Sequence, residues 1–454
     1  MFAHTKSEEY GSAVEDASKA IGLIPSYVKA AKIAPRDPDA RKKLKECEKA
    51  VREEAFQNAI ASPDSGPVGF RDFGIDVSSI EVEATYDGPR LEGEEVTLSF
   101  VQKMMDAFKN QKKLHRRYAY QILFQIREQL RALPSLVDIQ VPDGQHITVC
   151  GDIHGQFFDL MNIFEMNGLP SDTNPYLFNG DFVDRGSFSV ECIFTLFAFK
   201  CLYPTGIYLA RGNHESRSMN RIYGFDGEVK AKCGEPMVEL FADIFCCLPL
   251  AHVISSRVFV VHGGLFSKDG VTLDDVRGIN RFQEPPDEGL MCEVLWSDPF
   301  PGQGRMPSKR GVGVAFGSDV TKRFLQDNKL DLVVRSHEVK EEGYEEEHDG
   351  QLITVFSAPN YCDQMGNKGA FIRFQAPDLK PTFTTYTAVL ITVFSAPNYC
   401  DQMGNKGAFI RFQAPDLKPN FTTYTAVVSA AGARTGVGLL RLFSSLHPLP
   451  SARS

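Results

Sequence analysis

Short apolar runs alternate with polar, glycine-containing turns through the middle of the chain. Five of these runs have the length and the β-branched or aromatic content of buried strands. They are His146–Cys150, Tyr176–Asn179, Ile207–Ala210, Arg257–Val261 and Leu332–Val334. Before them, Tyr118, Ile122, Ile126 and Leu130 recur at four-residue steps, which predicts an amphipathic helix over Leu114–Leu133. The pattern indicates an α/β fold.

The turn after each predicted strand carries an Asp, an Asn or a His. GDIHG (Gly151–Gly155), GDFVDRG (Gly180–Gly186) and GNHE (Gly212–Glu215) follow the first three runs, and His262 and His337 follow the last two. A single histidine after a strand is more often structural, and Gly-Asp is a common turn. Five such turns in series are hard to explain in that way. We interpret them as one site in the crevice at the carboxyl ends of the strands.

Six side chains at these turns are candidate metal ligands. They are Asp152, His154, Asp181, Asn213, His262 and His337. Imidazole nitrogen mixed with hard oxygen, without thiolate, argues against calcium and against a structural cysteine-based zinc site. The set suits manganese, iron or zinc in a hydrolytic centre. Six ligands exceed the need of one ion and predict two divalent ions about 3.5–4 Å apart, with Asp181 as the bridge.

The residues beside these ligands point to a phosphoryl substrate. Arg185 follows closely after Asp181, and a guanidinium matches phosphate oxygens bidentately. A leaving alkoxide needs a proton, which His214, next to Asn213, could supply as a general acid. Asp184 is the candidate to orient His214 and to raise its pKa. The sequence therefore predicts phosphoester hydrolysis.

The motifs GDIHGQ, GDFVDRG, RGNHE, HGGLF, RSHE and SAPNYC resemble the metallophosphoesterase (calcineurin-like) family, in its serine/threonine protein phosphatase branch. Longer stretches such as NGDFVDRGSFSVE are similar to the type 5 subfamily in particular. The resemblance runs from about Val96 to Val389, so we expect the catalytic domain at residues 96–389. It implies a central β-sandwich flanked by helices, two metal ions with manganese favoured, and His214 as general acid.

The same resemblance assigns the substrate contacts. It places phosphate binding on Arg185, Asn213 and Arg310, and it places Tyr361 of SAPNY in the lining of the substrate site. Arg310 follows from the resemblance alone, because no local motif marks it. The expected reaction is hydrolysis of phosphoserine and phosphothreonine in phosphoprotein substrates.

The first 60 residues depart from this pattern. Their small residues and prolines are spaced as in a tetratricopeptide helix, yet Pro25 and Pro35 stand far closer than the repeat period of about 34 residues. We predict a truncated tetratricopeptide region over 1–60, with an irregular set of helices as the alternative, and a linker over 61–95. In the family, such repeats bind a heat-shock chaperone and cover the active site. A chaperone is therefore an expected partner, but this remnant is shorter than the roughly three stacked repeats that such a groove needs, which puts both roles in question.

The C-terminal part contains a tandem duplication. Residues 352–389 and 390–427 are identical except at Thr382 and Asn420. The first copy is expected to take its place in the sheet, which leaves the second as an apolar edge without a partner. Residues 428–454 contain no acidic side chain and are expected to be disordered.

Composition narrows the setting of the protein. A net charge of −9 argues against a nucleic-acid partner, and we find no apolar run long enough to span a membrane. The ten cysteines show no disulfide spacing, and the charged Met1–Glu15 segment is not a signal peptide. These features favour a reducing compartment, with the cytoplasm expected first and the nucleus second.

Two further functions compete with an active phosphatase. In one, the duplicated segment disturbs the sheet edge beside Tyr361, and the chain is a catalytically impaired interaction protein. In the other, the chain hydrolyses nucleotides or small phosphoesters with the same metals, which leaves SAPNYC and the repeat remnant unexplained.

Overall fold

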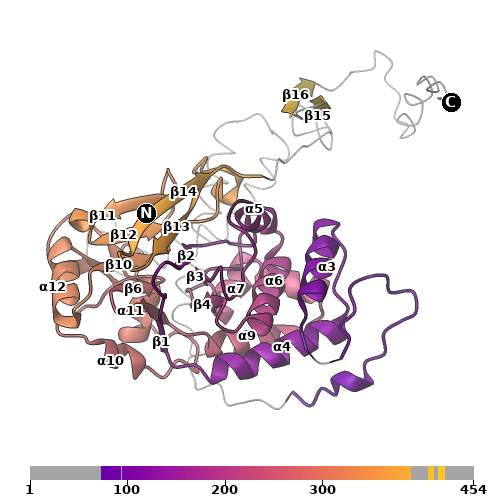
Figure 1. Cartoon of the computed structure of the whole chain (residues 1–454), viewed down its shortest axis with the longest axis horizontal. Coiled ribbons are helices and arrows are strands. Elements are labelled where there is room, and N and C mark those ends of the chain that lie inside the picture. Colours follow the sequence, from indigo (N-terminus) through magenta and orange to yellow (C-terminus); the bar gives the residue numbers. More distant parts are fainter. Residues whose placement is uncertain (1–72, 94, 390–406, 414–417, 425–454) are drawn as a thin grey trace, which may run out of the picture. The chain divides into compact units, whose positions relative to one another are not determined.

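The computed structural model describes residues 73–93, 95–389, 407–413 and 418–424 (Figure 1). These residues fall into two units, one made of 73–389 and one made of two strands near the C-terminus. The predicted tetratricopeptide remnant at 1–60 and the predicted tail at 428–454 lie outside the described residues.

The larger unit is built on two mixed sheets. The six-stranded sheet has the order β1 (Leu136–Ile139), β5 (Ala251–Ile254), β6 (Val258–Val261), β10 (Leu332–Arg335), β12 (Leu352–Val355), β11 (Tyr344–Glu347). The five-stranded sheet has the order β14 (Lys380–Tyr386), β13 (Gly369–Gln375), β2 (His146–Cys150), β3 (Tyr176–Phe178), β4 (Ile207–Leu209). A small third sheet contains β7 (Asp298–Pro299), β9 (Val314–Phe316) and β8 (Arg305–Pro307).

An apolar core joins the two large sheets face to face. Val149 and Ile372 of the five-stranded sheet lie in one buried cluster with Val260 and Val334 of the six-stranded sheet, and all four are fully buried. Burial on both faces explains why these strands read as continuous apolar runs rather than alternating ones. The predicted β-sandwich flanked by helices is confirmed.

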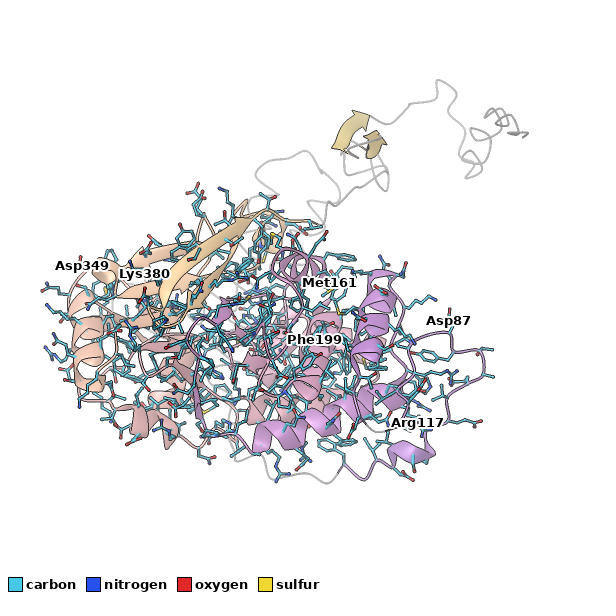
Figure 2. The ribbon with its side chains drawn as sticks, in the orientation of Figure 1. Asp87, Arg117, Met161, Phe199, Asp349 and Lys380 are labelled. Atoms are coloured by element: carbon cyan, nitrogen blue, oxygen red, sulfur yellow. The ribbon has the colours of Figure 1, made fainter. Side chains whose placement is uncertain are left out.

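Helices cover both outer faces of this sandwich (Figure 1). Over the five-stranded sheet lie α3 (Leu98–Lys109), α4 (Arg116–Arg131), α5 (Phe157–Asn167), α6 (Ser189–Leu202), α8 (Phe225–Lys232) and α9 (Pro236–Cys247). The six-stranded sheet packs against α10 (Leu273–Arg277), α11 (Leu290–Trp296) and α12 (Ser318–Asn328), and the short α7 (Arg217–Tyr223) adjoins the site. Figure 2 shows Phe199 of α6, fully buried, inside the larger helical layer. Among the described residues, no helix is long and apolar enough to cross a bilayer.

The predicted elements agree closely with the observed ones. All five apolar runs form strands, and the run His146–Cys150 has the bounds of β2. The predicted helix is α4, whose residues Tyr118, Ile122, Ile126 and Leu130 are all buried. The N-terminal side of α4 also receives partly buried apolar side chains from residues 73–93, including Ile75 and Tyr86.

The two copies of the duplicated segment take different places. The first supplies β12, β13 and β14, together with the 3-10 turn Tyr361–Asp363 between them. In the second, Gly407–Gln413 (β15) and Lys418–Tyr424 (β16) form an antiparallel pair of their own.

Candidate active site

The polar turns converge where the sequence predicted, at the carboxyl ends of parallel strands. Asp152 and Asp181 follow β2 and β3, which pair in parallel, and Asn213 lies beyond β4 in the same sheet. His262 follows β6, and His337 follows its parallel neighbour β10 in the other sheet. The two sheets therefore deliver the predicted ligands to one place from opposite sides.

All six predicted metal ligands are buried together, and we call them the floor of the site: Asp152, His154, Asp181, Asn213, His262 and His337. Asp181 lies at their centre, since its Oδ2 is 3.5 Å from His154 Nε2 and 3.4 Å from His262 Nε2. His262 Nε2 is also 2.9 Å from Asn213 Oδ1. Two overlapping clusters could each hold an ion, one of Asp181, His154 and His214 and one of Asp181, His262 and His337. Asp181 is the residue common to both.

Main-chain carbonyls fix the histidine rings of the floor. His154 Nδ1 donates to Val183 O at 2.9 Å, and His262 Nδ1 donates to Asn179 O at 2.8 Å. Each ring is therefore left with Nε2 as its lone-pair nitrogen toward the floor, the usual arrangement around a metal ion. His337 Nε2 is buried with no hydrogen-bond partner in the described residues. An unsatisfied buried imidazole beside carboxylates fits a metal ligand.

The charged groups of the floor shift one another's pKa values. Burial opposes ionisation of Asp181, but His262, His214 and His154 outweigh it and keep the pKa of its carboxyl well below the usual range. Burial also opposes protonation of His262, and Asp181 outweighs it, raising the pKa of His262 to about 9. In the same cluster, burial and the cationic Arg310 lower the pKa of His337. A divalent cation would replace protons on such a set.

His214 is bound to the carboxylate predicted to orient it. His214 Nδ1 lies 2.7 Å from Asp184 Oδ2, and Asp184 is fully buried. Asp184 in turn accepts from the Asn220 amide at 3.1 Å and from the Phe225 N–H at 2.9 Å. The His214 N–H donates to Asp181 Oδ1 at 2.9 Å, which ties this pair to the floor.

Several of these residues adopt left-handed backbone conformations that non-glycine residues rarely occupy. Their φ angles are +46° at His154, +50° at Asp181, +70° at Asp184, +72° at Arg185 and +70° at His337. Each such residue costs of order 1–3 kcal/mol and persists only where its surroundings determine it. Gly180, at φ +90°, has no such cost, and a Cβ there would lie 2.7 Å from His262 Nδ1.

Three predicted substrate contacts surround the floor, and we call Arg185, Arg310 and Tyr361 the rim. The exposed Arg185 guanidinium lies 3.7 Å from the centre of the Tyr223 ring. Arg310 binds Asp298 through two nitrogens, at 2.6 and 3.2 Å, and donates to His337 O. The Tyr361 ring lies 5.0 Å from the His154 ring. The rim residues thus come together at the floor from three separate loops.

Comparison with known proteins agrees with this geometry. A calcineurin-like phosphoesterase sequence family matches residues 145–341, and a PPP5 TPR repeat region matches residues 44–138. Serine/threonine-protein phosphatase 5 of Solanum lycopersicum is 60% identical over 428 residues, covering 79% of this chain and 77% of the relative. The human serine/threonine-protein phosphatase 5 is 53% identical over 411 residues, with 85% and 82% covered.

A solved structure gives the same result. A yeast protein serine/threonine phosphatase with similarity to human PP5 superposes with a TM-score of 0.63 at 41% identity, over 66% of this chain and 98% of that one. The chain belongs to the serine/threonine-protein phosphatase 5 family. It is a metal-dependent serine/threonine protein phosphatase. None of these findings favours the alternative of a catalytically impaired interaction protein.

The active site of this chain also contains residues that support the ligand turns and that the sequence did not predict. Glu215, fully buried, accepts the N–H groups of Asp181, Phe182 and Gly212, each at 2.8 Å, and so ties two ligand turns together. Its place in GNHE, directly after His214, was the available signal.

The rim depends on two further residues that the sequence did not mark. Asp298 receives Arg310 and also the buried Arg335, at 2.9 Å. Tyr223 stacks under Arg185 and lies 5.1 Å from the His214 ring. Asp298 lies 12 residues before Arg310 and Tyr223 lies at the end of α7, so no motif around either arginine could reveal them.

Proposed function

We propose that the floor residues would hold two divalent metal ions, with Asp181 as a ligand available to both, and that manganese is the favoured metal. The floor histidines around Asp181 support this assignment, because His154 Nε2 and His262 Nε2 lie 3.5 and 3.4 Å from its Oδ2. So does the mixture of imidazole and oxygen donors, which suits manganese, iron or zinc. The buried His337 Nε2, which has no partner among the described residues, gives further support.

Bound there, the two ions would supply an activated water for attack on phosphorus. Arg185 and Arg310 bind the phosphoryl oxygens of the substrate, and Asn213 assists them from the floor. His214 donates a proton to the serine or threonine oxygen as the phosphorus–oxygen bond breaks. Asp184 holds the ring by its Nδ1, which leaves Nε2 to make that donation. Tyr361 lines the substrate site.

The observation that carries this proposal is the His214–Asp184 pair, 2.7 Å apart, joined to Asp181 by the His214 N–H. The test is release of phosphate from a phosphoserine peptide by the purified chain with manganese. We expect His214→Gln to lower kcat roughly 10²–10⁴-fold while bound manganese, measured by elemental analysis, stays unchanged. Wild-type protein that binds manganese but releases no phosphate would refute the proposal.

We also propose a protein partner for the N-terminal region. The match to the PPP5 TPR repeat region supports a capacity for protein binding, and the resemblance suggests the acidic C-terminal peptide of a heat-shock chaperone. Calorimetric titration of that peptide into the full chain tests this. Binding without any change in phosphatase activity would favour a docking role without self-inhibition.

A further inference from the structure

The hairpin β13–β14 closes one edge of the five-stranded sheet. Its strand β13 pairs antiparallel with β14 on one side and with β2 on the other, where Phe371 lies opposite Cys150 and Ile372 opposite Val149. Ile372 is fully buried between the two sheets. The hairpin therefore belongs to both the sheet edge and the core.

The same hairpin occurs twice in this chain. The pairs run from Gly407 with Tyr424 to Gln413 with Lys418 in β15–β16, the same register as from Gly369 with Tyr386 to Gln375 with Lys380. The two sequences differ only at Thr382, which is exposed, and at its counterpart Asn420. Among the described strands, β15 pairs with β16 alone. The edge that β13 presents to β2 is thus present in β15 without a strand beside it.

From these observations we infer that β15–β16 is a second occupant for the place of β13–β14 against β2 of the same chain. Each residue of β13 has an identical counterpart in β15. Because the side chains and the turn determine the register, β15 should pair with β2 in the same register as β13. Asn420 does not interfere, since its counterpart Thr382 is exposed.

Chain connectivity explains why the first copy holds the place. When β13–β14 is paired with β2, the segment between β12 and the paired strand is short, because β12 ends at Val355 and β13 begins at Gly369. When β15–β16 takes the place, the loop between β12 and the strand beside β2 grows from about 13 to about 51 residues, and the three-halves power of that ratio disfavours the exchange roughly eightfold. The second copy therefore takes over only when the first is damaged by more than this factor.

The exchange matters because the hairpin supports a ligand turn. Ser357 Oγ accepts from the Gly151 N–H at 2.8 Å and donates to Ala370 O at 2.6 Å, and the Tyr386 hydroxyl donates to Ser357 O. Gly151 directly precedes the ligand Asp152. In the second copy, Ala408 and Tyr424 hold the register positions of Ala370 and Tyr386. A substituted hairpin would thus keep the same support.

The test introduces the same substitution into the first hairpin, the second hairpin or both, in the full chain. Ile372→Asp puts a carboxylate into the core opposite Val149 and should exclude β13 from the sheet. We expect phosphatase activity within about twofold of the unmodified chain, because the loop factor is small beside total stability. Ile410→Asp alone should change nothing. The pair Ile372→Asp with Ile410→Asp should lose activity by about a hundredfold or more, since no intact hairpin remains.

A cross-link shows directly which copy pairs with β2. Opposed residues of antiparallel strands have Cα separations that suit a disulfide. Phe371→Cys, opposite Cys150, checks in the unmodified background that the bond can form. In the Ile372→Asp background, Phe409→Cys should form a disulfide between Cys150 and the cysteine introduced at position 409, seen by peptide mass mapping in monomeric protein.

Two results would overturn the inference. One is an Ile372→Asp chain that loses as much activity as the double variant and forms no such disulfide. The other is a disulfide found only between two chains, in dimers separated by gel filtration, because exchange would then join molecules instead of restoring one.

Discussion

The floor and the rim of this active site hold their side chains in different ways. At the floor, Asp152, Asp181 and His262 are at most 1% exposed, and each lies within three residues of the end of a strand whose pairing fixes its position. At the rim, Arg185 is exposed, and both arginines keep their positions through side chains of other elements, Tyr223 at the end of α7 and Asp298 in β7. Backbone order thus determines the floor, and side-chain contacts determine the rim.

The difference between floor and rim explains where unfavourable backbone angles persist. The unfavourable backbone angles of His154, Asp181 and His337 persist because two packed sheets and the Glu215 carboxylate hold the turns from both sides. At the rim, Arg185 shares such an angle, but its side chain is exposed and lies over the Tyr223 ring, where it is accessible to a substrate. We therefore expect substitutions at the floor to affect metal binding and kcat, and those at the rim to affect KM.

The largest effect is expected at Asp181. Asp181→Asn removes the one carboxylate common to both candidate ion clusters, so we expect loss of bound manganese and a fall in kcat of about a thousandfold or more. Elemental analysis and phosphopeptide hydrolysis measure the two losses. Asp138→Asn, a surface change at a residue paired with Arg277, is the matched control and should alter neither. If Asp181→Asn kept two ions and near-normal kcat, Asp181 would not be the shared ligand.

A smaller effect is expected at Asp184, which contacts the floor only through His214. Asp184→Asn should lower kcat on phosphoserine peptides by roughly a hundredfold while bound manganese is retained, because the imidazole loses the carboxylate that orients it. A substrate with a good leaving group, such as para-nitrophenyl phosphate, needs little proton donation and should lose far less. Equal losses on both substrates would argue against a general-acid role for His214.

The contrast also explains how far the sequence could be interpreted. Strand-end turns are local, so the candidate metal ligands and His214 could be predicted from apolar runs followed by Asp, Asn or His. Arg310 was found only by resemblance, and Asp298 and Tyr223 were missed, because their importance lies in tertiary contacts of β7 and α7 that no local motif marks. The acidic run Glu341–Asp349 contains β11, an edge strand whose glutamates suit an edge that stays unpaired on one side.

A third prediction concerns a buried histidine outside the floor and the effect of its protonation on the stability of the fold. His252 of β5 is equally buried, and no carboxylate of the described residues is paired with it. Burial together with Lys200 lowers its pKa to about 3, and the Tyr208 ring lies beside it. In the unfolded chain His252 therefore binds a proton as the pH falls through about 6.5, whereas in the folded chain it stays neutral until about pH 3. Stability is complete above pH 6.5 and falls as the pH decreases, by about 2 kcal/mol between pH 6.5 and 5.

Chemical denaturation of metal-free protein at these two pH values tests this expectation. In His252→Phe the loss should be smaller by the same amount, since the group that refuses the proton is gone. The floor histidines contribute equally to both proteins and cancel in the difference, and Lys200, with a pKa lowered to about 8 by burial, stays protonated throughout this range. Parallel pH profiles for the two proteins would contradict the prediction.

The smallest effect is expected at the rim, at Tyr223. Tyr223→Leu removes the ring under the Arg185 guanidinium, and an exposed contact of this kind contributes about 0.5–1 kcal/mol, so KM should rise roughly two- to fivefold. Tyr223→Phe keeps the ring and should keep the KM. Because Tyr223 also lies 5.1 Å from the His214 ring, a fall in kcat instead of a rise in KM would mean that it acts through the acid and not through the phosphate contact. Tyr223 would then belong with the residues that support His214, and its contact with Arg185 would not contribute to substrate binding.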